Sequence, residues 1–187
     1  MPRETLSLLV TAPITLGILW LLITPTPRNR NVVASEDYAV YAAVLGSRTR
    51  TLVSRDLIPA RDLPDRRWWA RDRSSWASIE APQPSLDTLE DFQQVNRRLL
   101  QLDVAPLASL PVILKTNREL RQLKKRDDQL WVPVVHMSRV GFNREWTEAV
   151  VYVQYMCGPW CGGGGFILLG KVDGTWRIRA SRSSWVA

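Results

Sequence analysis

The sequence has very few of the residues from which metal and redox sites are built. It contains one histidine, His136, and two cysteines, Cys157 and Cys161, among 187 residues. A structural zinc site needs about four such ligands. The two cysteines stand in a C-x3-C spacing rather than the C-x-x-C of thioredoxin-like redox sites. We therefore predict that the chain holds no metal ion and no cofactor.

The motifs of the common enzyme classes are also missing. The chain has no G-x-S-x-G elbow and no H-E-x-x-H zinc motif. The glycine run 162–165 lacks the Gly-Lys-Ser/Thr ending of a phosphate-binding loop. His136 lies in the run PVVHMSR, which favours a strand, where a lone histidine is more often packed than catalytic. We predict a non-catalytic protein, with an enzyme that uses His136 and a nearby carboxylate as the weaker alternative.

Lysine is scarce, yet the chain is strongly basic. Only four of the 25 basic residues are lysine, and the formal net charge is +7. A basic protein surface is either simply solvated, or it is attracted to anionic lipid or to an acidic partner. Nucleic acid would also attract a basic chain. The membrane anchor that the beginning of the chain predicts makes nucleic acid the least favoured partner.

The beginning of the chain lacks charge. No charged residue occurs from Thr5 to Thr24, and a helix of that length spans about 30 Å, the thickness of a bilayer core. Trp20 near its distal end suits the membrane interface. We predict a transmembrane anchor over residues 1–27, a linker over 28–34 and an extracytoplasmic domain over 35–187. A cleaved signal peptide and a buried helix of a soluble protein are the alternatives.

The charges that flank this segment decide its orientation only weakly. Arg3 precedes the expected span, and Arg28 and Arg30 follow it, which favours a cytoplasmic domain by the positive-inside rule. The cysteine pair points the other way, because disulfides persist in oxidising compartments. We predict that the domain lies outside the cytosol.

Helical patterns dominate the first two thirds of the domain. Ser35 precedes an apolar stripe with helical spacing that Gly46 ends. A strand is expected over Thr51–Ile58, and a second helix from Ser85 through Leu102. Further along, Thr116 and Glu119 form a capping box for a surface helix over residues 117–128.

The last third changes to strand patterns. Four β-rich runs follow one another, and Asp173-Gly174 between two of them is a strong hairpin signal. In the final run Trp176, Ile178 and Ala180 alternate with polar residues, which predicts one buried face. The predicted fold class is α+β: an N-terminal transmembrane helix, then one domain of helices packed on one face of a C-terminal antiparallel β-meander.

Residues 60–84 form an irregular segment rich in tryptophan and arginine. Tryptophan and arginine are enriched at interface hot spots, so we predict that this segment contacts a partner. The alternative is that the tryptophans plug the edge of the core while the arginines stay solvated. The residues concerned are Arg66, Arg67, Trp68, Trp69 and Trp76.

The stretch CGPWCGGGG over residues 157–165 is predicted to connect two strands. One strand should end at Cys157 and the next should begin near Phe166, with glycines allowing a tight path between them. A local disulfide between Cys157 and Cys161 would hold Trp160 outward as a contact point. Two free buried thiols are the alternative.

The C-terminal third resembles a loose group of uncharacterised bacterial exported or membrane-anchored proteins. The resemblance rests on an S-x-V-G-F-N turn from Ser138, then T-x-A, V-Y-V, a C-G…C-G loop and a final G-x-W hairpin. No activity is attached to that group. The resemblance implies an exported domain with a structured cysteine loop, held at the bacterial inner membrane and facing the periplasm.

The expected function is structural. We predict a single-pass accessory subunit that packs against a larger bacterial membrane complex, of respiratory or photosynthetic type, with the lipid bilayer and an integral membrane protein complex as its partners. The main alternative is an extracytoplasmic module that binds a small ligand or a peptide in an apolar pocket.

Overall fold

The computed structural model describes residues 31–46, 51–64, 82–126, 133–158 and 160–187. The predicted anchor with Trp20 lies outside the described residues, and so do the predicted contact residues Arg66, Arg67, Trp68, Trp69 and Trp76. Within the described ranges, the helices are all too short or too polar to cross a membrane.

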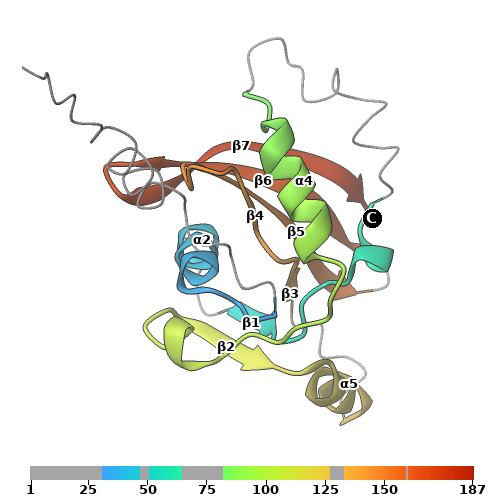
Figure 1. The fold of residues 1–187 in the computed structure, drawn as a ribbon. Helices are drawn as coiled ribbons and strands as arrows, with labels where there is room; N and C mark the ends of the chain where they lie inside the picture. Colours follow the sequence, from blue (N-terminus) through green and yellow to red (C-terminus); the bar gives the residue numbers. More distant parts are fainter. Residues whose placement is uncertain (1–30, 47–50, 65–81, 127–132, 159) are drawn as a thin grey trace, which may run out of the picture.

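The described part of the chain is built around one mixed β-sheet (Figure 1). The strands run in the order β2-β1-β3-β5-β6-β7, and β4 pairs with β5 beside this path. β1 pairs in parallel with both β2 and β3, whereas the remaining pairs are antiparallel. The strand bounds are β1 Thr51–Ser54, β2 Val112–Lys115, β3 Val134–Met137, β4 Gly141–Phe142, β5 Glu148–Gly158, β6 Cys161–Val172 and β7 Thr175–Val186.

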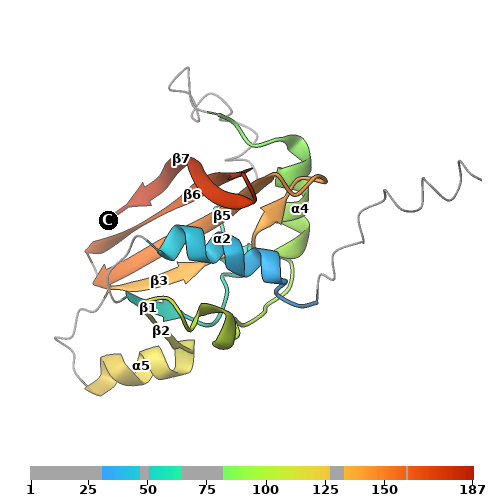
Figure 2. The ribbon, with the colours of Figure 1, turned by 90° about the vertical axis from the view of Figure 1, so that its left-hand side faces the viewer.

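Two helices cover opposite faces of this sheet (Figures 1 and 2). Helix α2, Ser35–Leu45, packs on the face that carries Val151 and Leu169. Helix α4, Leu86–Val95, packs its Phe92 on the other face. Helix α5, Asn117–Arg126, lies beside β2 at the edge of the sheet opposite β7. Short 3-10 turns occur at Ala60–Asp62 and Ala105–Leu107.

The predicted fold class is therefore wrong. Helices cover both faces of the sheet rather than one, and the sheet is mixed because three short parallel strands complete it. The described helices do not include the transmembrane helix that was part of that prediction.

Strand β2 was not predicted at all, because four residues between loops carry too little periodicity to reveal a partner far away in the chain. The second predicted helix ends at Val95, well before Leu102, which is buried after a turn.

Strand β5 is the centre of the sheet and is buried on both sides. Ala149 and Val151 face α2, while Val150 and Tyr152 face α4, and all four are fully buried. Burial on both faces explains why the sequence here reads as a continuous apolar run rather than an alternating one.

The VGFN turn positions α4. Gly141 lies so close to the helix that an added Cβ would stand 2.6 Å from the Cα and the N of Phe92. Asn143 closes the turn, since its Oδ1 accepts hydrogen bonds of 2.9 Å from the backbone N–H groups of Thr147 and Glu148. Glu148 then accepts from the N–H of Ser85, the residue that caps α4.

The β6–β7 hairpin is tied to α2. Asp173 and Gly174 adopt φ values of 49° and 74°, as a two-residue type I′ turn requires. The Trp176 Nε1–H donates a 2.8 Å hydrogen bond to the Glu36 carboxylate, which also contacts the Lys171 ammonium.

The expected alternation along β7 is broken by a register shift between Leu168 and Leu169. As a result Trp176 packs with the α2 core, whereas Ala180 packs with the α4 core. Ile178 is half exposed, so the prediction of one continuous buried face on this strand is wrong.

The close contact at Gly141 gives a test of the fold. We expect Gly141→Ala to lower the free energy of unfolding by about 1–3 kcal/mol, because the new methyl group meets helix backbone that cannot rotate away. Urea unfolding followed by circular dichroism measures this. Gly170→Ala is the matched control, since its Cβ would meet the exposed Arg179 side chain, which can move. Equal losses in the two variants would contradict the packing described.

Candidate functional site

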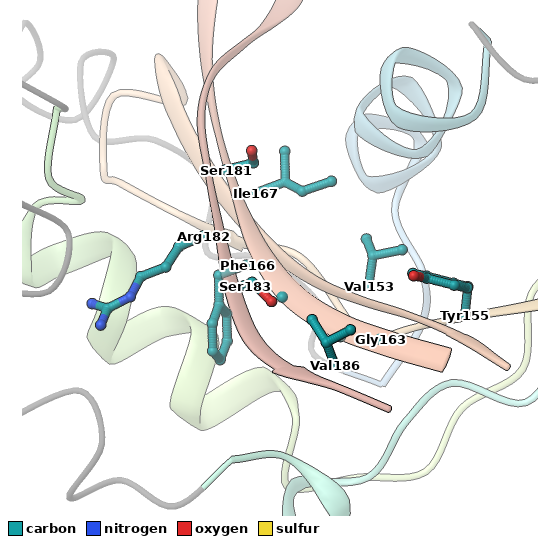
Figure 3. A pocket seen from close by; sticks show the side chains of 11 residues that line it. Val153, Tyr155, Gly163, Phe166, Ile167, Ser181, Arg182, Ser183 and Val186 are labelled. Carbon is teal, nitrogen blue, oxygen red and sulfur yellow. The ribbon is translucent and has the colours of Figure 1, made fainter. Parts of the chain in front are cut away.

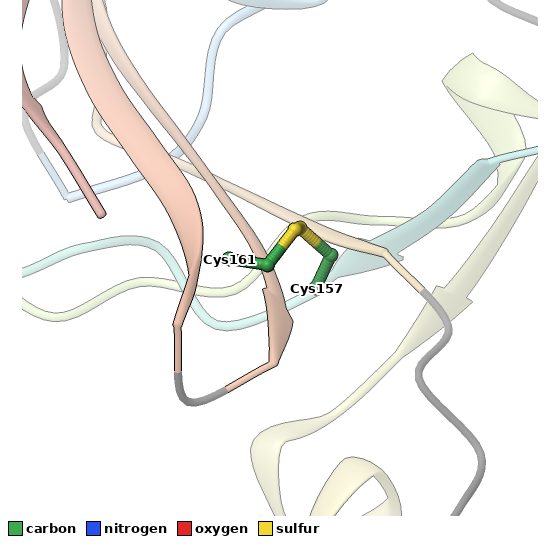
Figure 4. The surroundings of a disulfide bond; sticks show 2 residues. All are labelled: Cys157 and Cys161. Carbon is green, nitrogen blue, oxygen red and sulfur yellow. A yellow bond between two sulfur atoms is a disulfide. The ribbon is translucent and has the colours of Figure 1, made fainter.

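Strands β5 and β6 extend beyond both helices and end in a covalently closed hairpin (Figure 4). Cys157 and Cys161 form a disulfide with their Cα atoms 5.1 Å apart, which confirms the predicted pair. The register of β5 shifts between Met156 and Gly158, so Cys157 itself stands at the irregularity in the strand. The closed ring is short, so we expect it to define the shape of the hairpin more than the overall stability.

The four glycines after this hairpin are strand rather than loop, contrary to the prediction. β6 begins at Cys161, and residues 162–165 pair with β5 on one side and, from Gly163, with β7 on the other. Side chains of neighbouring strands occupy the space that residues with a Cβ would need. A Cβ at Gly163 would stand 3.0 Å from the Tyr155 ring, and one at Gly164 would stand 3.0 Å from Tyr152 Cζ.

On the α4 side of the sheet, this room is filled by a hydrogen-bonded aromatic pair. The Trp185 Nε1–H donates to Tyr152 Oη at 2.8 Å, directly over Gly164. Ser184 Oγ donates to the Gly164 carbonyl at 2.9 Å and lies 3.2 Å from Tyr152 Oη. The glycine run is therefore closed on this face.

On the α2 side, the same glycines leave a hollow of about 210 Å³ (Figure 3). Gly163 and Gly165 contribute only backbone to its floor, while Val153 and Ile167 line it with apolar surface. The hydroxyl-bearing Ser181 and Ser183 come from β7, and Tyr155 and Val186 stand at the end nearest the disulfide. The side chains of Phe166 and Arg182 point to the opposite face of the sheet.

Large apolar side chains are exposed around the end of the hairpin. The Trp160 side chain lies within the disulfide loop and is 90% exposed, which agrees with the expectation that it points outward. Its neighbours on the strands are also exposed, and we call the four residues the tip cluster: Tyr155 (41%), Met156 (37%), Trp160 (90%) and Val186 (75%).

His136 lies on β3, on the face of the sheet opposite to Val135 and Met137. Burial lowers the pKa of its imidazole, and the nearby Asp56 carboxylate opposes this shift. The Asp56 carboxylate accepts hydrogen bonds from Gln101 Nε2 at 2.7 Å and from the backbone N–H of Asn117. Among the described residues, Asp56 is the carboxylate that shifts the His136 pKa, and both of its oxygens hold chain segments together, which is a structural arrangement.

A buried arginine was missed by the sequence reasoning. Arg139 is 1% exposed, and its guanidinium donates to the carbonyl of Val95 at 3.3 Å and to that of Val32 at 2.9 Å. A cation at the C-terminal end of α4 is favoured by the helix dipole. Arg139 therefore joins the segment before α2 to the end of α4. Arg139 is the unspecified position of the S-x-V-G-F-N turn, so the motif did not mark it.

In the described ranges of the chain, no group of three or more His, Cys, Asp or Glu side chains is placed to hold a metal ion. The motif residues of the C-terminal third have packing and turn-forming partners instead, as described for Gly141, Asn143 and Trp176. The hollow and the tip cluster are consequently the best candidates for a functional surface.

The lowered pKa of His136 predicts a pH dependence of stability. The folded state keeps the imidazole neutral, whereas the unfolded chain takes up a proton near pH 6.5. The free energy of unfolding should therefore fall as the pH drops below about 6.5, towards the folded-state pKa. Urea unfolding between pH 7 and pH 5 should show this slope in the native chain and a weaker one in His136→Gln. The Glu119 carboxyl, with a pKa of about 2, titrates below this window.

Comparison with protein-family models, with curated proteins and with solved structures finds no match to this chain. The shape and chemistry of the surfaces described above are therefore the features that indicate a function. The hollow beside the glycine run and the exposed tip cluster lie at the same end of the sheet.

Proposed function

We propose that this protein is a non-catalytic accessory subunit that packs against a larger membrane complex, and that the hollow is the surface it uses. The observation that carries the proposal is the hollow itself, an apolar trough with a backbone floor beside an otherwise helix-covered part of the sheet. A partner side chain placed there would gain apolar contacts, and the two serine hydroxyls offer hydrogen bonds at the rim.

The size of the hollow favours a protein partner over a small molecule. Pockets for small ligands usually enclose about 300–1,000 Å³ and bury most of the ligand, whereas this one holds about 210 Å³. That volume suits one or two side chains of a partner surface. This hollow is therefore better suited to a side chain of a partner protein than to a small ligand.

Three properties of the chain support a preformed contact surface on a protein that lies at a membrane outside the cytosol. The disulfide is typical of proteins that fold in an oxidising compartment, in line with a location outside the cytosol. The net charge of +7 favours approach to anionic surfaces such as membranes. The residues that line the hollow lie on strands β5, β6 and β7, which are held together over their full length, so the surface is preformed.

Filling the hollow tests this function. Ser183 is exposed at the rim, so Ser183→Phe should occupy the hollow without disturbing the core. Thr175→Phe, at the far end of the same strand and also exposed, is the matched control. We expect Ser183→Phe to reduce co-purification with the native membrane complex in mild detergent by about tenfold or more, while Thr175→Phe retains it. Circular dichroism checks that both variants are folded.

Equal recovery of the complex with both variants would contradict the proposal. So would a native chain that elutes from the same detergent extract as a free monomer, because an accessory subunit has to remain bound. Loss of the complex in Ser183→Phe alone supports it.

A further inference from the structure

The parts of β5, β6 and β7 that carry the tip cluster have no charged side chain. Residues 155–165 read YMCGPWCGGGG and residues 183–187 read SSWVA, so both strands and the hairpin are uncharged there. Tyr155, Trp160 and Trp185 make this end aromatic as well as apolar. Tryptophan and tyrosine are the residues that concentrate at the membrane–water interface, because each ring has an apolar body and a polar group.

We propose that the tip cluster inserts into the headgroup region of an anionic lipid bilayer, while the hollow beside it contacts the partner complex. This inference rests on the membrane setting of the proposed function. It assigns a second, separate surface and a different partner to the chain.

The shape of the tip favours lipid over a protein partner. Tyr155 and Val186 stand on the α2 side of the sheet, Met156 belongs to the opposite side, and Trp160 lies at the apex of the hairpin. A protein partner normally covers one face of such a projection. A bilayer surrounds it on all sides, so it is the medium that covers the whole cluster.

The charge distribution also favours an anionic bilayer. β7 carries the exposed arginines Arg177 and Arg179 towards its other end, and the chain as a whole has a net charge of +7. A net positive charge favours the approach of the whole chain to membranes that contain anionic lipids, while the uncharged tip enters the headgroup region. A second copy of the chain is a poorer occupant, because both copies carry a net charge of +7 and repel each other.

A partner could also bind by adding a strand to the sheet at the edge strand β7. The sequence of β7 opposes this kind of pairing. β7 is the outermost strand and pairs only with β6 among the described strands. It carries two register shifts and the exposed arginines Arg177 and Arg179, which are devices that keep sheet edges from pairing. The exposed apolar surface at the tip is therefore the feature left to be covered.

The disulfide gives the tip the rigidity that shallow insertion needs. It closes the hairpin directly on either side of residues 158–160, so Trp160 is presented without a long flexible loop. A side chain already held in its bound position loses less conformational entropy when it enters the interface.

Fluorine NMR of the full chain tests the inference at single-residue level. The chain is labelled with 5-fluorotryptophan and reconstituted in phosphatidylcholine bicelles, with or without phosphatidylglycerol. The Trp160 resonance is the one that disappears in Trp160→Phe, a change that an exposed position tolerates. Trp176, which is buried in the α2 core, is the internal control.

We expect a nitroxide-labelled lipid to broaden the Trp160 resonance, more strongly with phosphatidylglycerol present, and to leave Trp176 unchanged. A water-soluble paramagnetic agent should broaden Trp160 weakly. Strong broadening of Trp160 by the soluble agent, without broadening by the lipid nitroxide, would overturn the inference.

Co-purification separates this inference from the proposed function. Trp160→Ala should retain the partner complex, because the hollow is unchanged, and Ser183→Phe should retain the lipid broadening of Trp160. Loss of the complex in Trp160→Ala would show that the tip binds protein instead of lipid, and would overturn the inference. If Ser183→Phe retains both the partner complex and the lipid broadening of Trp160, the proposed function is contradicted and the inference about the tip stands.

Discussion

The structure depends on one strand that is buried on both sides. β5 pairs with β6 over almost its whole length and separates two cores, one built with α2 and the other with α4. Polar contacts position its neighbours. Asn143 closes the turn before it, and Ser138 donates its N–H to the Tyr152 carbonyl while its hydroxyl accepts the Tyr152 N–H. Because β5 and β6 are longer than the helices that cover them, one end of the sheet extends beyond the core and becomes available for contacts.

The free end of the sheet has its shape because four consecutive residues there are glycines, which have no side chain. The glycines at 162–165 leave room for Tyr152 and Trp185 on one face and open the hollow on the other. A disulfide then closes the hairpin, so an uncharged, aromatic projection stands beside an apolar trough. The two surfaces have different shapes, and different partners for them are therefore physically reasonable. The net charge of +7 on the whole chain favours anionic surroundings.

Local features were predictable from the sequence, and long-range ones were not. The helix that begins at Ser35, the capping box of Thr116 and Glu119 and the Asp173-Gly174 hairpin each depend on a few neighbouring residues, and all three occur in the structure. The parallel pairing of β1 with β2 joins residues about 60 positions apart through four-residue strands, for which no local signal exists. The glycine run was predicted as a loop because glycine usually marks one. Its pairing as a strand depends on Tyr152, Tyr155 and Trp185, which only the tertiary structure brings next to it.

The most direct measurement of the central claim is amide hydrogen exchange along the glycine run in the oxidised chain. If residues 162–165 form a strand between β5 and β7, their paired amides exchange slowly, at rates close to those of Val150 and Val151 in the core. Exchange at the rate of an unstructured peptide would contradict the account, since the hollow and the rigid tip would then have no ordered framework.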